Sequence, residues 1–222
     1  MAGCDRAKDF LRFGLNSRRH NQIIPKQLIH MQDKQRDSRP PARSRQYGLV
    51  IWLTGLSGAG KSTIAYRLQS ILTKAGRQVC LLDGDVVRRN LCSDLGFTAA
   101  DRKENIRRVA EVARLMADTG VICIVALISP YDADRQQARV LVKQGRFVEI
   151  FINAPLAVCE ARDPKGHYAR ARAGRLKQFT GISSPYEAPK DPEIELPTDQ
   201  MTIRESVGQI LEYLKTRHRL II

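Results

Sequence analysis

From residue 48 onward, short apolar runs alternate with longer stretches in which apolar and polar residues are interleaved. The apolar runs are rich in β-branched residues and end in turn-forming residues, which predicts buried strands. They cover residues 49–54, 79–82, 121–128 and 147–152, with a shorter candidate at 194–196. Continuous apolar runs of this kind are typical of parallel strands, which are covered on both faces.

The interleaved stretches predict helices, at residues 62–75, 101–119 and 203–215. The middle one is the clearest: Asp101 and Glu104 form a capping-box pattern, apolar residues recur at helical spacing, and Gly120 ends the helix. Strands that alternate with helices predict an α/β fold with a doubly wound, mainly parallel sheet. In such sheets ligands bind beyond the carboxyl ends of the strands.

A glycine-rich loop joins the first predicted strand to the first predicted helix. It reads Gly-Leu-Ser-Gly-Ala-Gly-Lys-Ser at residues 55–62, the pattern of a phosphate loop (P-loop), in the strand–loop–helix context that this pattern requires. The glycines let backbone N–H groups surround an anion, Lys61 is placed to neutralise the β- and γ-phosphates, and Ser62 to ligate Mg²⁺. The alternative is a glycine-rich turn without a ligand. The predicted nucleotide-binding residues are Gly55, Leu56, Ser57, Gly58, Ala59, Gly60, Lys61, Ser62 and Thr63.

Polar residues follow the other predicted strands and should meet at the same edge of the sheet. They are Asp83, Asp85 and Arg88 after the second strand, Ser129 after the third, and Arg102 and Asn105 at the start of the clearest helix. Phosphoryl transfer needs positioning, charge neutralisation and a group that accepts the proton of the acceptor hydroxyl, and this set offers all three. Taken singly, Asp-Gly-Asp is also a common turn, and Ser129 before a proline also ends strands.

Two downstream segments complete the predicted domain. Residues 162–174 are basic and glycine-bracketed, which in a small P-loop kinase predicts a lid that closes over the nucleotide; a solvated helix is the plain alternative. Residues 183–197 contain four prolines and predict an extended surface segment.

The amino-terminal residues differ from the rest. Residues 1–47 hold 11 Lys and Arg against 4 Asp and Glu, and residues 33–45 are polar with two adjacent prolines. We therefore predict a flexible basic extension at 1–47 ahead of a kinase domain at 48–222. An organellar transit peptide is the alternative, against which Asp5 and Asp9 count.

Composition excludes several classes of protein. The chain has 222 residues, 43% of them hydrophobic, which is enough for a core, and a net charge of +14 without any recognised nucleic-acid motif, so no nucleic-acid partner is expected. Its five cysteines form no CxxC pair, which argues against a zinc site or a disulfide framework and suits a reducing compartment. The longest apolar run is too short to span a bilayer and no signal-peptide core is seen, so we expect a cytoplasmic protein without a membrane partner.

Several motifs together resemble the adenylylsulfate kinase (APS kinase) family, from about residue 48 to the end of the chain. They are the P-loop, Asp-Gly-Asp at 83–85 with Arg88, Asp-Leu-Gly-Phe at 94–97, Glu-Asn-Ile-Arg-Arg at 104–108, Ile-Ser-Pro-Tyr at 128–131, Lys-Gly at 165–166 and Phe-Thr-Gly-Ile at 179–182. The resemblance implies an ATP- and Mg²⁺-dependent enzyme that transfers the γ-phosphate of ATP to the 3′-hydroxyl of adenylyl sulfate, giving 3′-phosphoadenylyl sulfate. A homodimer is compatible with it.

The resemblance also implies roles for single residues. Lys61, Asp85 and Ser129 form the expected catalytic set, with Asp85 approaching the 3′-hydroxyl. Phe97 and Phe179 would sandwich the adenine of adenylyl sulfate. The full expected substrate-binding set is Asp83, Arg88, Phe97, Arg102, Asn105, Ile128, Ser129, Lys165 and Phe179.

The chain departs from the family pattern at Val86, at Cys92 and Ser93, and at Asp132, where loss of positive charge would weaken the binding of an anionic substrate. Two other functions stay open at this stage. One is a different small-molecule P-loop kinase, acting on a nucleoside monophosphate or a sugar. The other is a non-catalytic nucleotide-binding domain of a sulfate-activating complex; retention of Lys61, Asp85 and Arg102 favours an enzyme.

Overall fold

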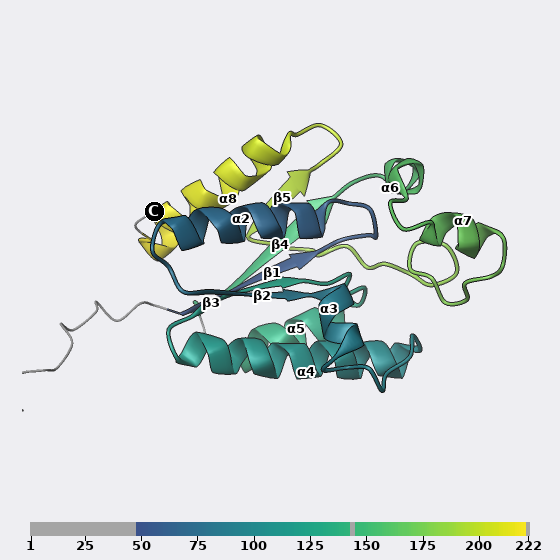
Figure 1. The fold of residues 1–222 in the computed structure, drawn as a ribbon, viewed down its shortest axis with the longest axis horizontal. Helices are drawn as coiled ribbons and strands as arrows, with labels where there is room; N and C mark the ends of the chain where they lie inside the picture. The colour runs from purple at the N-terminus through teal and green to yellow at the C-terminus, as the bar shows by residue number, and fades with distance from the viewer. Residues whose placement is uncertain (1–47, 143–144, 221–222) are drawn as a thin grey trace, which may run out of the picture. The chain divides into compact units, whose positions relative to one another are not determined.

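The structure, a computed structural model, describes residues 48–142 and 145–220; the extension predicted at 1–47 lies outside the described residues. The described part is a sheet with helices on both faces (Figure 1). Its strands are β1 (Leu49–Thr54), β2 (Val79–Asp83), β3 (Ile122–Ala126), β4 (Phe147–Asn153) and β5 (Ile194–Pro197).

The sheet order is β2-β3-β1-β4-β5, and each neighbouring pair is parallel. The strand that carries the P-loop is therefore central, with Leu53 opposite Ala126 of β3 and Ile150 of β4. The chain first builds the β2–β3 side of β1 and then the β4–β5 side, so β1 lies where the winding reverses, the place at which such sheets bind ligands. The doubly wound parallel sheet predicted from the sequence is confirmed.

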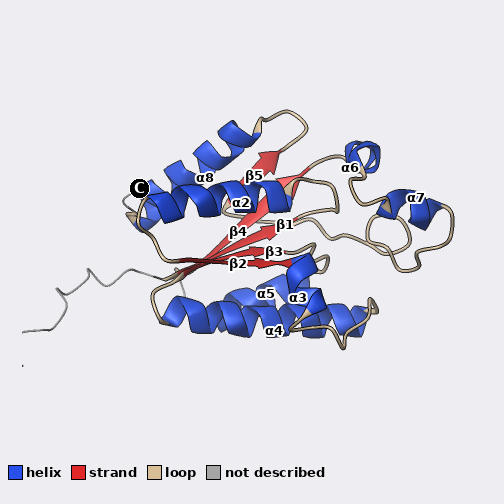
Figure 2. Ribbon diagram, in the orientation of Figure 1, coloured by secondary structure: helices blue, strands red, loops and turns tan. Residues whose placement is uncertain are grey.

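The helices divide between the two faces (Figure 2). They are α2 (Lys61–Lys74), α3 (Gly84–Arg89), α4 (Ala99–Asp118), α5 (Asp132–Leu141), α6 (Leu156–Arg162), α7 (His167–Arg172) and α8 (Ile203–His218). Helices α2 and α8 cover one face, α4 and α5 cover the other, and α6 and α7 stand beyond the carboxyl ends of the strands. Among the described residues, no helix combines the length and apolarity needed to cross a bilayer.

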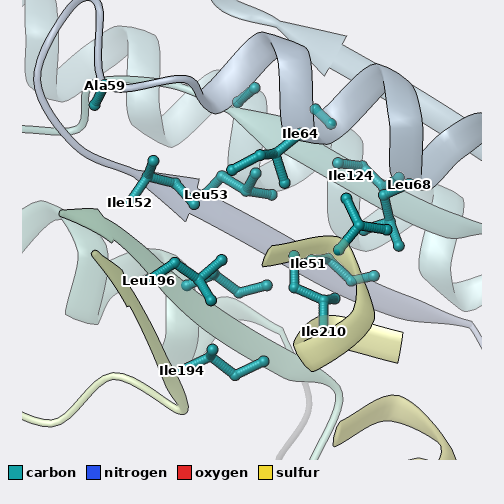
Figure 3. Close-up of a cluster of buried hydrophobic side chains, with 14 of the residues drawn as sticks. Ile51, Leu53, Ala59, Ile64, Leu68, Ile124, Ile152, Ile194, Leu196 and Ile210 are labelled. Atoms are coloured by element: carbon teal, nitrogen blue, oxygen red, sulfur yellow. The ribbon is translucent and has the colours of Figure 1, made fainter. Parts of the chain in front are cut away.

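Two hydrophobic clusters sandwich the sheet. On one face, Ile51 and Leu53 of β1 pack with Ile64 and Leu68 of α2 and with Ile210 of α8 (Figure 3). On the other face, the intervening β1 residues pack with α4 and α5, in a cluster that includes Val50, Trp52, Val109 and Ala138. Because β1 buries both faces, it needs an uninterrupted apolar sequence, which is why its pattern is not alternating.

The structure corrects the start of the clearest helix. Helix α4 begins at Ala99, because Thr98 is its N-cap: the Thr98 hydroxyl accepts a hydrogen bond from the Asp101 N–H, and the Asp101 carboxylate accepts from the Thr98 N–H. The predicted capping box of Asp101 and Glu104 was wrong. Glu104 instead pairs with Arg107 and Arg108 on the surface of the helix.

The third strand is also shorter than the 121–128 run, since β3 ends at Ala126. Beyond it the chain turns toward the end of β1, where the Thr54 hydroxyl donates to the Ile128 carbonyl at 2.8 Å. Helix α3 was not predicted; it starts directly after β2 because the Asp83 side chain caps it, accepting from the Asp85 N–H at 3.0 Å.

Candidate active site

The P-loop connects β1 to α2 and has the backbone that its glycines predict. Gly55, Gly58 and Gly60 all have positive φ. A Cβ at Gly55 would lie 2.4 Å from the carbonyl oxygen of Ile152, and one at Gly58 would lie 2.9 Å from that of Cys159. These two positions therefore need glycine for space as well as for conformation, which fixes the loop against β4 and α6.

Lys61 lies at the start of α2 with its ammonium group turned into the loop. It donates to the carbonyl oxygens of Gly55 at 2.9 Å and Leu56 at 2.6 Å. Burial lowers the pKa of Lys61 from 10.5 to about 8. Neutral carbonyl acceptors thus hold the ammonium next to the loop. An anionic ligand bound there would form a stronger, charge-assisted hydrogen bond with it.

Ser62 and Asp83 form a pair of oxygen groups beside Lys61. The Ser62 hydroxyl donates to Oδ2 of the buried Asp83 at 2.6 Å. Hydroxyl, carboxylate and phosphate oxygens are what Mg²⁺ prefers, and Mg²⁺ usually takes only one or two protein ligands. The pair fits such an ion, even though the described residues contain no cluster of three or more His, Cys, Asp or Glu side chains suited to a metal.

One cavity of about 840 Å³ opens in front of the P-loop. All the predicted site residues line it except Gly55 and Leu56, of which Leu56 lines a separate depression beside residues 181–186. The cavity has two sides, which we name by their residues. The arginine side comprises Arg88, Phe97, Arg102, Asn105 and Phe179; the α8 side comprises Arg162, Thr198, Met201, Thr202, Ile203 and Ser206.

The arginine side combines positive charge with aromatic surface. The Arg88 guanidinium lies 4.4 Å from the centroid of the Phe97 ring, and Phe97 is 52% exposed. Arg102 is buried and is held by the Phe97 carbonyl, the Gln178 carbonyl and the Thr180 hydroxyl. Phe179 packs edge-on against Tyr168. Arg102 thus connects α4 to the segment that carries Phe179, and the rings of Phe97 and Phe179 line the same cavity.

Asn105 supplies a further polar group on this side. It is 3% exposed, and its Nδ2 has no hydrogen-bond partner among the described residues. Buried donors in folded proteins are nearly always paired, so an unpaired one in a cavity wall suggests a group reserved for a ligand.

Asp85 and Lys165 both line the cavity and contact one another. Asp85 belongs to the first turn of α3, and Lys165 to the link between α6 and α7; their side chains form a hydrogen-bonded ion pair. Both are about half exposed, so the pair is one that solvent screens and that a ligand can separate. Sequence reasoning placed both residues at the site but did not predict this contact.

Ser129 and Ile128 form the wall between β3 and the P-loop. Ser129 is 3% exposed, and its hydroxyl oxygen accepts a hydrogen bond from the indole N–H of Trp52 at 3.1 Å. The hydroxyl is thus part of the cavity wall and is also bonded to the core.

Apart from Arg162, the first residue of the predicted lid, the α8 side was missed by sequence reasoning. Arg162 donates to the Gly58 carbonyl at 3.3 Å and to the Thr198 carbonyl at 2.8 Å, and the Thr198 hydroxyl donates to the Ala59 carbonyl at 2.7 Å. These contacts clamp the segment after β5 to the P-loop. Thr198 directly follows β5, so the rule that located Asp83 after β2 would have located it too.

Comparison with known proteins agrees with this geometry. Residues 47–197 match the model of the family described as adenylylsulphate kinase. The chain is 54% identical over 174 residues to the adenylyl-sulfate kinase of Vibrio cholerae, covering 78% of this chain and 81% of that one. It is 56% identical over 168 residues to the adenylyl-sulfate kinase of Citrobacter koseri, covering 76% and 83%.

Among solved structures, the fold is similar to that of the Mycobacterium tuberculosis APS kinase CysC in complex with AMPPNP and APS. The TM-score is 0.74 and the identity 43%, over 77% of this chain and 99% of that one. Because the family match covers more than half of the chain, and both relatives exceed half identity across most of their length, this chain belongs to the adenylylsulphate kinase family.

Proposed function

We propose that this protein transfers the γ-phosphate of ATP to the 3′-hydroxyl of adenylyl sulfate, giving 3′-phosphoadenylyl sulfate and ADP. The observation that carries the proposal is the two-sided cavity centred on the P-loop. A kinase of this kind needs a nucleotide on each side of the transferred phosphoryl group. The chain offers a P-loop between an arginine–aromatic side and a side built from residues after β4 and β5.

ATP would occupy the P-loop and the α8 side. Backbone N–H groups of the loop and the amino end of α2 would face its phosphates, and Lys61 would exchange its two carbonyl acceptors for phosphate oxygens. Mg²⁺ fits Ser62 with Asp83 close by, and when bound it would neutralise phosphate charge. The Asp83–Ser62 contact supports a role for Asp83 beside Mg²⁺, in place of the substrate-binding role that the family resemblance implied.

Adenylyl sulfate would occupy the arginine side. Phe97 offers an exposed ring for an adenine and Phe179 a largely buried one in the cavity wall, Arg88 offers positive charge, and Asn105 offers its unpaired N–H group. Asp132, which replaces the basic residue expected there, does not bring free negative charge, because its carboxylate accepts from the buried Arg135.

Asp85 would accept the proton of the attacking hydroxyl. A ribose hydroxyl is too weak an acid to ionise at neutral pH, so a carboxylate at the cavity mouth assists its attack on the γ-phosphate. The ion pair with Lys165 must open for this to happen. Adenylyl sulfate and the triphosphate carry the negative charge that would attract Lys165 away from Asp85 and draw the segment of α6 and α7 over the cavity, as expected for a lid.

The test is a coupled assay of ADP release in which adenylyl sulfate is compared with AMP, shikimate and gluconate as acceptors. Turnover with adenylyl sulfate alone supports the proposal. Equal or faster turnover with another acceptor would favour a different small-molecule kinase, and nucleotide binding without turnover on any acceptor would favour a non-catalytic domain. A homodimer stays a prediction, which sedimentation of the purified protein tests.

A further inference from the structure

Ser129 has an unusual backbone for its position. Its φ is +39°, in the left-handed region that non-glycine residues rarely adopt, and it is 3% exposed at the cavity wall. Such a conformation persists only where the surrounding structure holds it in place. Three contacts hold Ser129, and they come from two elements, β1 and α5.

The first contact is with the side chain of Trp52 in β1. Trp52 is fully buried and stacks on Phe147, with ring centroids 5.7 Å apart. Its indole N–H donates to the Ser129 Oγ at 3.1 Å. An indole can only donate, so the serine oxygen must be the acceptor. The hydroxyl proton of Ser129 has no acceptor among the described residues, and the oxygen's position leaves that proton to be given to a ligand in the cavity.

The second contact is with Arg135 of α5, which is completely buried. Its guanidinium donates to the Ser129 carbonyl at 2.8 Å, to Oε1 of Glu149 at 2.7 Å, and to Oδ1 of Asp132 at 3.1 Å. The guanidinium is a rigid planar fork, so three acceptors on one fork fix the serine carbonyl relative to β4 and α5. The third contact, from the Thr54 hydroxyl to the Ile128 carbonyl, fixes the preceding peptide.

We propose that Trp52 and Arg135 are positioning residues for the acceptor substrate: together they hold Ser129 in its left-handed conformation and make its hydroxyl a hydrogen-bond donor to an anionic group of that substrate. The inference rests on the proposed function, because it takes the cavity beside Ser129 as the place of the acceptor. Neither residue touches a ligand; both act through Ser129. An uncommitted hydroxyl could turn either its lone pair or its proton toward the cavity, whereas one that accepts from Trp52 offers its proton.

The main test is Trp52→Phe, which keeps an aromatic ring against Phe147 and removes the N–H. The KM for adenylyl sulfate should rise about tenfold or more, as expected when a hydrogen bond to a charged group is lost, while the dissociation constant for ATP stays within about twofold. The matched control is Phe147→Leu, which loosens the same cluster but leaves the N–H in place. It should lower the Tm without raising the KM. A Trp52→Phe enzyme with the wild-type KM would overturn the proposal.

A double-mutant cycle with Ser129→Ala shows whether the two residues act as one. Trp52→Phe and Ser129→Ala remove the same bond, so their effects on KM should be strongly non-additive, whereas Phe147→Leu and Ser129→Ala should add. Because Trp52 is the only tryptophan of the chain, Ser129→Ala should also shift the fluorescence emission of the free protein. Additive effects on KM together with an unchanged emission spectrum contradict the role of Trp52.

Arg135→Lys tests the second contact and keeps a positive charge beside the buried Glu149, which Arg139 also contacts. A lysine keeps the charge but cannot serve three acceptors in one plane, so the KM for adenylyl sulfate should rise while the ATP dissociation constant does not change. A lower Tm with an unchanged KM would show that Arg135 is only structural. If the wild-type protein phosphorylated no adenylyl sulfate, the proposed function itself would fail. A failure confined to the variants leaves that function standing and removes only this inference.

Discussion

We predict that Lys61 makes the binding of ATP depend on pH. In the free protein its ammonium is buried and donates to two P-loop carbonyls, and burial lowers its pKa to about 8. A bound triphosphate would surround it with negative charge and return the pKa toward its ordinary value of 10.5. Between these two values, a neutral Lys61 must take up a proton when ATP binds.

The size of the effect follows from that pKa. With a pKa of about 8, Lys61 is about nine-tenths neutral at pH 9 and about one-tenth neutral at pH 7. Binding should therefore take up about 0.9 proton at pH 9, and the affinity should be about tenfold weaker at pH 9 than at pH 7. Because the pKa of Lys61 is lower in the folded than in the unfolded protein, unfolding takes up a proton between about pH 8 and 10.5. Lys61 therefore lowers the free energy of unfolding of the ligand-free protein by its full amount below pH 8, and this destabilisation fades as the pH rises through that window.

Isothermal titration of ATP in two buffers with different ionisation enthalpies measures the proton directly. At pH 9 the terminal phosphate, whose second pKa is about 6, is already deprotonated and contributes nothing. The control is Lys61→Ala, which should take up no proton and should lose nearly all phosphoryl transfer, because the cation on the β- and γ-phosphates is gone. Uptake below about 0.2 proton at pH 9, or the same uptake in the variant, would refute the reasoning.

Three further predictions concern other parts of the chain. Asp85→Asn should lower kcat by about 10²–10⁴ in single-turnover kinetics while the ATP dissociation constant moves little; a normal rate would make Asp85 a turn residue. Removing residues 1–45 should leave a folded, active kinase, because residues from Leu49 onward supply the two hydrophobic clusters seen among the described residues; loss of a cooperative melting transition would contradict this. Thr202→Ala removes the capping box of α8 and should cost about 0.5–2 kcal/mol in denaturant unfolding, and an unchanged midpoint would show that the cap contributes nothing.

Features that depend on residues close together in the sequence could be predicted. The P-loop and the parallel sheet follow from apolar runs and from glycines whose positions leave no room for a side chain. The strand-end rule placed Asp83, Asp85 and Ser129 around one cavity. The roles of Lys61 and Ser62 came from the P-loop pattern, those of the substrate-binding residues came from the family resemblance, and all of them stay predictions.

Features that depend on contacts between distant segments were not predictable in the same way. The sequence fits two capping boxes, one of Thr98 with Asp101 and one of Asp101 with Glu104. Which of them forms depends on the residue at which the helix begins, and in the structure Thr98 is the N-cap. The Asp85–Lys165 pair joins residues 80 positions apart, and the clamp of Arg162 onto Thr198 joins α6 to the end of β5. No periodicity encodes such contacts, because they arise only when the chain has folded.

The sheet order also separates most of the arginine side from the α8 side along the sequence. Arg88, Phe97, Arg102 and Asn105 come from the β2–β3 side of the central strand, whereas Phe179 lies within residues 162–206, from which the α8 side is built. Substitutions that alter the choice of acceptor can therefore accumulate largely in residues 88–105, apart from the P-loop and the α8 side that would hold ATP. A P-loop strand in the middle of the sheet makes the scaffold open to evolving new acceptors, one half at a time.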